Sequence, residues 1–137
     1  MALTDPAVIE DVKARLADSK PGDGRRCTEV RTVSKVRGTD LLTRMRYSPI
    51  IPGSILIRFH DGLGVPVDHP HHPAPPPAFE LRDKGDGTFE GKLGPAGGGI
   101  TNTIDYLYGV ISLRAPREFL TAEVIYDWRP DLQREYA

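Results

Sequence analysis

The feature that most restricts the fold is a series of short alternating segments beside glycine turns toward the end of the chain. Ile104 and Tyr106 alternate with polar neighbours before Gly109, and Val110 and Ser112 continue the alternation after it. A period of two is what a strand needs when one face is buried and the other is wet. Gly109 can take the positive φ that a tight reversal requires. The segment therefore predicts two antiparallel strands joined by a turn at Tyr108-Gly109.

Further segments share this β pattern along the chain. They cover residues 28–36, 41–47, 54–60, 88–93 and 120–128. In the segment 54–60 we expect Ile55, Ile57 and Phe59 to face inward. A chain of 137 residues with 14 glycines and 13 prolines fits one domain of short strands joined by turns. We predict a mainly β fold, an antiparallel β-sandwich with a jelly roll as the alternative arrangement, and a short N-terminal helix.

Residues 4–18 predict that helix. Thr4 or Asp5 can cap it, and Pro6 suits its first turn because its missing N–H is not needed there. One face carries a narrow apolar stripe of Val8, Ile9, Val12 and Leu16. Such a stripe docks either on its own domain or on another subunit, and the sequence leaves both possibilities open.

The chain divides into three predicted parts. Residues 1–26 form a helix and linker arm, residues 27–128 the β-sandwich domain, and residues 129–137 a tail. Leu132 and Tyr136 in the tail are spaced for one docked turn or for contact with a neighbour. The expected assembly contacts are therefore Val8, Ile9, Val12, Leu16, Leu132 and Tyr136.

A histidine- and proline-rich loop at residues 61–77 interrupts the β pattern. Its prolines favour an extended polyproline II conformation and exclude helix. His69, His71 and His72 in this loop are the candidate metal ligands, because clustered histidines bind zinc, copper or nickel. A cupin would place a glutamate within a few residues of its His-x-His pair, whereas here the next glutamate is Glu80. We favour a solvated loop with no metal and no cofactor, and keep a metal-binding β-barrel as an alternative.

Other chemical signals are weak. Asp83 and Asp86 sit beside glycines and are expected to be turn residues rather than an acid/base pair. Cys27, the single cysteine, has no nearby histidine and is expected to be inert. Tyr106, Tyr108 and Trp128 could stack on a sugar, which gives a carbohydrate-binding module as a second alternative. No catalytic motif stands out, so we expect no enzyme activity.

The net charge of the chain and the character of its apolar segments limit the classes of partner that we expect. The formal net charge is −1, which favours neither nucleic acid nor an anionic membrane. The first residues lack the positive and apolar regions of a signal peptide, and no stretch has the apolar length of a membrane span. We expect a protein that is made in the cytoplasm and binds neither membrane nor nucleic acid.

Four sequence pieces occur in a distinctive order between residues 49 and 128. They are Pro52-Gly53-Ser54-Ile55, Asp86-Gly87-Thr88-Phe89-Glu90-Gly91, Ile104-Asp105-Tyr106 with Gly109-Val110-Ile111-Ser112-Leu113, and Val124-Ile125-Tyr126. As an ordered set they resemble a β-domain that recurs in structural proteins of tailed bacteriophages. Two features depart from that pattern, because the loop after the first piece is long and the Asp86-Gly87-Thr88 turn lacks a second glycine before its strand.

The resemblance implies a non-enzymatic virion protein. Proteins of this kind occur as head decoration, neck, tail or baseplate components. The implied partners are other copies of the chain and capsid, neck or tail subunits, and the implied location is the virion, after synthesis in the host cytoplasm. The helix and tail would then act as arms that become ordered on contact with neighbouring subunits.

Overall fold

The structure is a computed structural model that describes residues 5–32, 44–60, 67, 70–74, 76–77, 79–91, 103–112 and 121–132. These residues form a mainly β protein with antiparallel sheets and a short N-terminal helix, as predicted. No helix in the described part of the chain has the length and apolar character to cross a bilayer.

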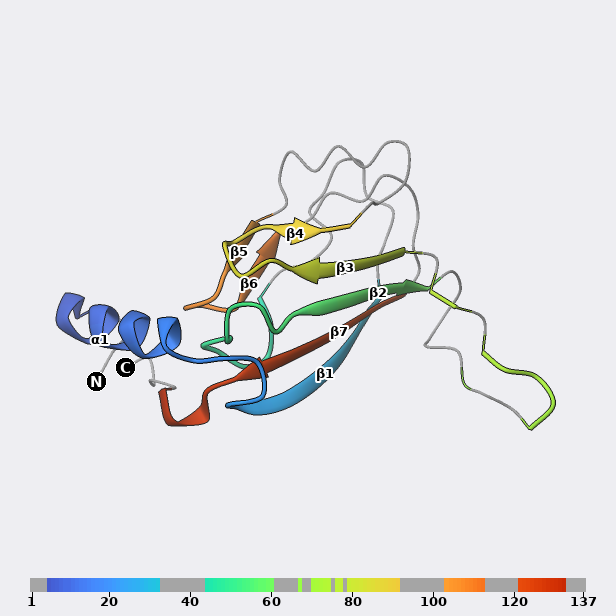
Figure 1. The fold of residues 1–137 in the computed structure, drawn as a ribbon, viewed down its shortest axis with the longest axis horizontal. Coiled ribbons are helices and arrows are strands. Elements are labelled where there is room, and N and C mark those ends of the chain that lie inside the picture. The colour runs from blue at the N-terminus through green and yellow to red at the C-terminus, as the bar shows by residue number, and fades with distance from the viewer. Residues whose placement is uncertain are drawn as a thin grey trace.

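Five strands form the main sheet (Figure 1). They are β1 (Arg25–Thr32), β2 (Leu56–His60), β3 (Phe79–Asp83), β4 (Phe89–Glu90) and β7 (Thr121–Trp128), in the order β1-β7-β2-β3-β4. Every neighbouring pair is antiparallel. The long strand β7 pairs with β1 on one side and with β2 on the other, so Val124 lies between Glu29 and Ile57. The last described strand is therefore an interior strand of the sheet, next to the edge strand β1.

A two-stranded sheet shares the core of the main sheet. It consists of β5 (Thr103–Asp105) and β6 (Val110–Ser112). Their buried side chains, Ile104 and Ile111, belong to the same apolar cluster as Ile57, Phe59 and Val124 of the main sheet. Ile55, Ile57 and Phe59 are buried as predicted. The jelly-roll alternative stays a prediction.

The turn between β5 and β6 confirms the expected reversal. Gly109 has a φ of 68°, in the left-handed region. A Cβ there would lie 3.2 Å from the Tyr47 carbonyl oxygen and 3.2 Å from the Ser48 Cβ. Glycine is therefore required both by the backbone angle and by the close approach of residues 47–48.

Residues 44–47 do not form the strand predicted for 41–47; residues 41–43 lie outside the described residues. Only Arg44 makes an isolated bridge, to Val110. The amide of Met45 instead donates to the Gly109 carbonyl at 2.7 Å, and the amide of Ile50 donates to the Tyr106 carbonyl at 2.8 Å. The segment follows the tip of the β5–β6 hairpin because its amides bond there rather than in a ladder.

The N-terminal helix α1 (Pro6–Ala17) begins as predicted. The Asp5 carboxylate accepts a hydrogen bond of 2.9 Å from the Ala7 amide, and Pro6 occupies the first turn. Val12 and Leu16 are buried against Leu107 and against Leu132 of the short 3-10 helix η1 (Pro130–Leu132). Of the two possibilities left open for the apolar stripe, docking on its own chain is the one observed.

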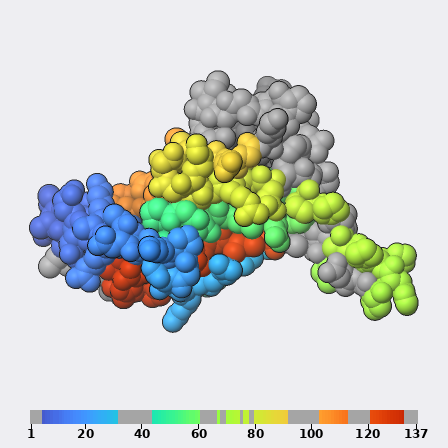
Figure 2. All heavy atoms as spheres, in the orientation of Figure 1, coloured from blue at the N-terminus to red at the C-terminus, as the bar shows by residue number. Residues whose placement is uncertain are grey.

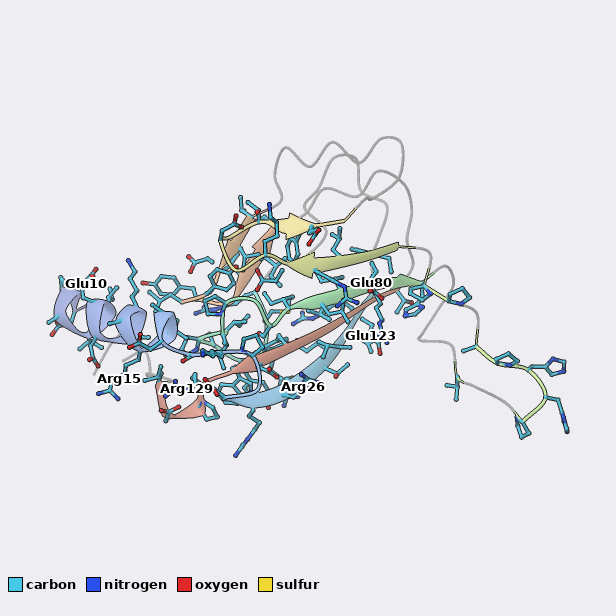
Figure 3. The ribbon with its side chains drawn as sticks, viewed as in Figure 1. Glu10, Arg15, Arg26, Glu80, Glu123 and Arg129 are labelled. Atoms are coloured by element: carbon cyan, nitrogen blue, oxygen red, sulfur yellow. The ribbon has the colours of Figure 1, made fainter. Side chains whose placement is uncertain are left out.

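The predicted boundaries of the arms need correction. Strand β1 begins at Arg25, so the boundary expected after residue 26 falls inside a strand. The two arms also contact each other, because Arg129 Nη1 donates to Ser19 Oγ at 2.6 Å. Figure 3 shows Arg129 below the C-terminal end of α1. The helix and the start of the tail are therefore packed parts of one body.

Candidate functional site

A well-connected polar group of the described structure is the carboxylate of Asp83, at the end of β3. It is 9% exposed and accepts three hydrogen bonds. The Gly53 amide donates at 2.6 Å, the Gly85 amide at 2.8 Å and the Tyr106 hydroxyl at 2.5 Å. We call this group, together with Gly87, the Asp83 junction. It joins three parts of the chain that are far apart in sequence.

Tyr106 completes the junction. Its hydroxyl oxygen accepts from the Gly87 amide at 3.0 Å, and the Ile104 amide donates to the Gly87 carbonyl at 2.9 Å. Burial and the hydrogen bond to Asp83 raise the pKa of the Tyr106 phenol. The proton therefore stays on Tyr106, and the hydroxyl both donates and accepts within the fold.

A second polar cluster lies on the other side of the core, around Glu29 of β1. Its Oε2 accepts from the Tyr126 hydroxyl at 2.5 Å and from the Arg46 amide at 2.9 Å, and its Oε1 accepts from the Arg31 guanidinium. Burial, the largest single influence, opposes the charged form of Glu29. The hydrogen bonds and the Arg31 charge together outweigh it and lower the pKa of Glu29. The carboxylate thus anchors the segment 44–47 to β1 through the amide of residue 46.

Asp127 of β7 anchors a third connection. Its side chain is 3% exposed, accepts from the Gly22 amide at 2.8 Å, and pairs with Arg26 Nε at 3.2 Å. Its own amide donates to Ser54 Oγ at 3.1 Å. The linker after α1 and the residues before β2 are both fixed to β7 through this residue.

The outward face of the sheet carries a row of charges. Arg58 of β2 is paired in register with Glu80 of β3 on one side and Glu123 of β7 on the other. Figure 3 labels the two glutamates on their neighbouring strands. Arg58 Nε lies 3.4 Å from Glu80 Oε2, and His60 Nε2 lies 3.4 Å from Glu123 Oε1. Opposite charges on neighbouring strands stabilise the pairing of those strands. The row of charged side chains therefore contributes to the stability of the sheet.

The predicted histidine site is not assembled in the described residues. His71 and His72 are exposed, and His69 lies outside the described residues. His60, which is buried, faces Glu123 on the sheet instead. The part of the chain that the structure describes contains no group of three or more metal-ligating side chains. The metal-binding alternative stays a prediction.

The aromatic residues are used in packing. Trp128 is 5% exposed and stacks on Tyr47, with ring centroids 4.3 Å apart and planes 9° apart. Tyr106 and Tyr108 are half-buried. Trp128 therefore does not belong to an open aromatic platform with the two tyrosines. The carbohydrate-binding alternative stays a prediction.

The expected assembly contacts fall into two groups. Val12, Leu16 and Leu132 are at most 4% exposed and already packed within the chain. Val8 and Ile9 are half-buried at the edge of the same cluster, and Tyr136 lies outside the described residues. Contact with another subunit stays a prediction for these residues, and of the described ones Val8 and Ile9 have surface left for it.

A pocket that no sequence signal predicts lies between α1 and the β5–β6 hairpin. Its volume is about 410 Å³. Leu16, Ala17, Pro52 and Leu107 make its walls mainly apolar, while Lys13 and Asp105 add one charge of each sign. A pocket between two elements packed through tertiary contacts has no local signal in a sequence.

Comparisons with protein families, with curated proteins and with solved structures each find no match to this chain.

Proposed function

We propose that this chain is a non-enzymatic structural protein of a tailed-bacteriophage particle. It binds neighbouring copies of itself and capsid, neck or tail subunits, and so stabilises the particle as a decoration, neck, tail or baseplate component. The protein is made in the host cytoplasm and works in the virion. The proposal begins from the ordered set of four sequence pieces between residues 49 and 128.

The observation that carries the proposal is how these four pieces meet. The first supplies the Gly53 amide, the second supplies Gly87, and the third supplies the Tyr106 hydroxyl, all at the Asp83 junction. The fourth is connected through Ser54, whose hydroxyl accepts from the amide of Asp127, next to Tyr126. A set of residues that closes one fold explains why the pieces occur together and in order. This supports a shared domain with the phage proteins that the sequence resembles.

Three carboxylates inside the domain have structural partners. Asp83, Glu29 and Asp127 each hold at least one backbone amide from a distant segment. Buried carboxylates used in this way rigidify a scaffold. A rigid scaffold whose sequence includes a long proline-rich loop suits a protein that reaches neighbouring subunits.

The test is the composition of purified particles. Particles released from the bacterium whose genome encodes this chain are banded on a density gradient and analysed by quantitative peptide mass spectrometry. We expect the chain at a constant ratio to the major capsid or tail subunit across the band. As a matched control, a chain carrying Asp83→Ala, which loses the junction, is expected to be absent from the band. A chain that stays in the soluble fraction and never bands with particles contradicts the proposal.

A further inference from the structure

Strand β1 is a long edge of the main sheet. It pairs with β7 along all eight of its residues, and no other strand of the described part of the chain adjoins it. Figure 1 shows β1 as the lowest strand of the sheet, and in Figure 2 its light-blue atoms form part of the lower border of the molecule. The strand contains no proline, glycine or bulge. A long, regular edge of this kind is a template for pairing with another chain.

The pairing with β7 fixes the direction of the backbone groups of β1. The Asp127 amide donates to the Ser54 hydroxyl, and its carbonyl also bonds on that side, away from β1. Arg26, its partner in register, therefore points its own N–H and C=O away from β7, and so, by the alternation of an antiparallel strand, do Thr28 and Val30. Among the described residues, no group bonds to the outward amides and carbonyls of Thr28 and Val30.

Val30 is the apolar centre of this edge. Its side chain is 55% exposed, and it is one of two large apolar residues exposed among the described residues, the other being Val67. It lies opposite Glu123 of β7, on the outward face of the sheet, where Thr28 is exposed as well. A strand added to this edge would cover the valine and satisfy the outward backbone groups.

The residues around Val30 are complementary to a second copy of themselves. The segment reads Thr28-Glu29-Val30-Arg31-Thr32. When two copies pair antiparallel with Val30 opposite Val30, each Glu29 lies opposite an Arg31 and each Thr28 lies opposite a Thr32. Apolar pairs and opposite charges that lie directly across a ladder stabilise it. This matching along five successive positions points to another copy of the chain as the partner.

The neighbouring registers match less well. A twofold axis one residue earlier places two Glu29 carboxylates opposite each other, and an axis two residues earlier places Arg25 opposite Arg31. Like charges in these positions destabilise pairing. An axis at Cys27 avoids such a clash but leaves Val30 opposite a residue that precedes the first residue of β1. Of these four registers, the axis at Val30 alone combines matched charges with coverage of the valine.

We propose that two copies of this chain pair antiparallel through the open edges of β1, with a twofold axis at Val30. The two main sheets then become one continuous sheet. The Arg31–Glu29 ion pairs of the two copies lie side by side across the axis and form one network of four charges. The contact is isologous, because each copy uses the same surface. The inference rests on the proposed function, in which copies of the chain bind one another, and names the surface that they use.

Substitutions at Val30 test the contact from an exposed position. Val30→Asp places two negative charges at the axis, and Val30→Lys places two positive charges there. Val67→Asp is the matched control, because Val67 is the other exposed valine and lies between β2 and β3, outside the contact. Circular dichroism melting first verifies that all three variants fold like the wild type.

Sedimentation equilibrium over a range of concentrations then measures the dissociation constant of the dimer. We expect the wild type and Val67→Asp to dimerise with equal affinity. Val30→Asp and Val30→Lys should each raise the dissociation constant about tenfold or more, because like charges replace an apolar contact. An equal mixture of the two Val30 variants should form heterodimers in native mass spectrometry, because opposite charges now meet at the axis.

A cysteine cross-link tests the register. In a chain that carries Cys27→Ser, Val30→Cys should form an intermolecular disulfide under mild oxidation, because residues bonded across an antiparallel pair have Cα atoms about 5.5 Å apart. The wild type, whose one cysteine is Cys27, should form none. A wild-type disulfide with none at Val30→Cys contradicts the axis at Val30.

Two further outcomes overturn the inference. One is a wild type that stays monomeric at every concentration, and the other is a pair of Val30 variants that dimerise as the wild type does. Particle composition decides the proposed function separately. A chain that bands with particles without dimerising through β1 keeps its structural role and loses this contact. A chain that dimerises through β1 but never bands with particles keeps the contact and loses the proposed function.

Discussion

Tyr106 and Asp83, which are 23 positions apart in the sequence, share a hydrogen bond of 2.5 Å between phenol and carboxylate. This bond links the β5–β6 hairpin to the end of β3 in the main sheet. Because Asp83 also accepts from the Gly53 amide, one side chain connects three turns. The stability of the whole arrangement should therefore respond to changes in either residue.

We expect Tyr106→Phe to lower the free energy of unfolding by about 1–3 kcal/mol, because the buried Asp83 carboxylate loses one donor and the Gly87 amide loses its acceptor. Urea denaturation of Tyr106→Phe, Asp83→Asn and the double variant gives the coupling between the two residues. A clearly non-zero coupling is expected because they are in contact. Strictly additive effects would show that the bond contributes nothing in solution.

Asp127 and Arg26 form an unequal pair. The Asp127 side chain is 3% exposed and also holds the Gly22 amide, whereas the Arg26 side chain is 69% exposed. Asp127→Ala should destabilise the protein by about 1–3 kcal/mol, through the lost buried hydrogen bonds. Arg26→Ala should cost at most about 1 kcal/mol, as for other exposed ion pairs. Thermal and urea unfolding measure both, and equal losses would contradict the assignment of Asp127 as the structural anchor.

The packing of α1 on the β domain predicts that substitutions in the buried face of the helix lower the stability of the whole protein. Leu16 is 4% exposed and packs on Leu107 and Leu132. Leu16→Ala should destabilise the protein by about 2–5 kcal/mol, and Val8→Ala, at a half-buried position of the same helix, by clearly less. Both are measured by circular dichroism melting. If Leu16→Ala melts like the wild type, the helix does not pack on the domain in solution and acts as a free arm.

The lowered pKa of Glu29 predicts how the stability of the fold depends on pH. Its pKa is lower in the folded protein than its ordinary value of 4.5. A carboxyl of this kind stabilises the fold at pH values above the unfolded pKa, and the contribution is lost as the pH falls through the folded pKa. Urea unfolding at neutral pH and at values below 4.5 should therefore show a loss for the wild type that is smaller in Glu29→Gln. If the wild type and Glu29→Gln lose the same free energy of unfolding as the pH falls, Glu29 does not contribute to the acid sensitivity of the fold.

The strands and the helix could be predicted because their signals are local. The alternation of Ile55, Ile57 and Phe59 directly specifies the buried face of β2, and Asp5 and Pro6 specify the start of α1. The strand predicted at residues 41–47 was wrong for its described part, because the Met45 amide bonds to the hairpin turn instead. Local β propensity cannot show which backbone partner a segment finds.

The polar connections could be predicted only in part. The expectation of a turn residue is confirmed for Asp86, whereas Asp83 is the last residue of β3 and only its side chain joins the turn, by accepting from the Gly85 amide. The sequence did not reveal that Asp83 also binds Gly53 and Tyr106, nor that β7 is an interior strand. Those features depend on strand order, which involves pairing between distant segments. The pocket at α1 was missed for the same reason.

The most direct test of the account is to add the purified protein to particles that lack it. Particles are prepared from a phage whose copy of the gene is deleted, mixed with increasing amounts of the wild-type chain, and separated from free protein on a gradient. We predict saturable binding at a fixed number of copies per particle. No protein on the particles at any concentration would contradict the central claim that the chain is a structural component of the virion.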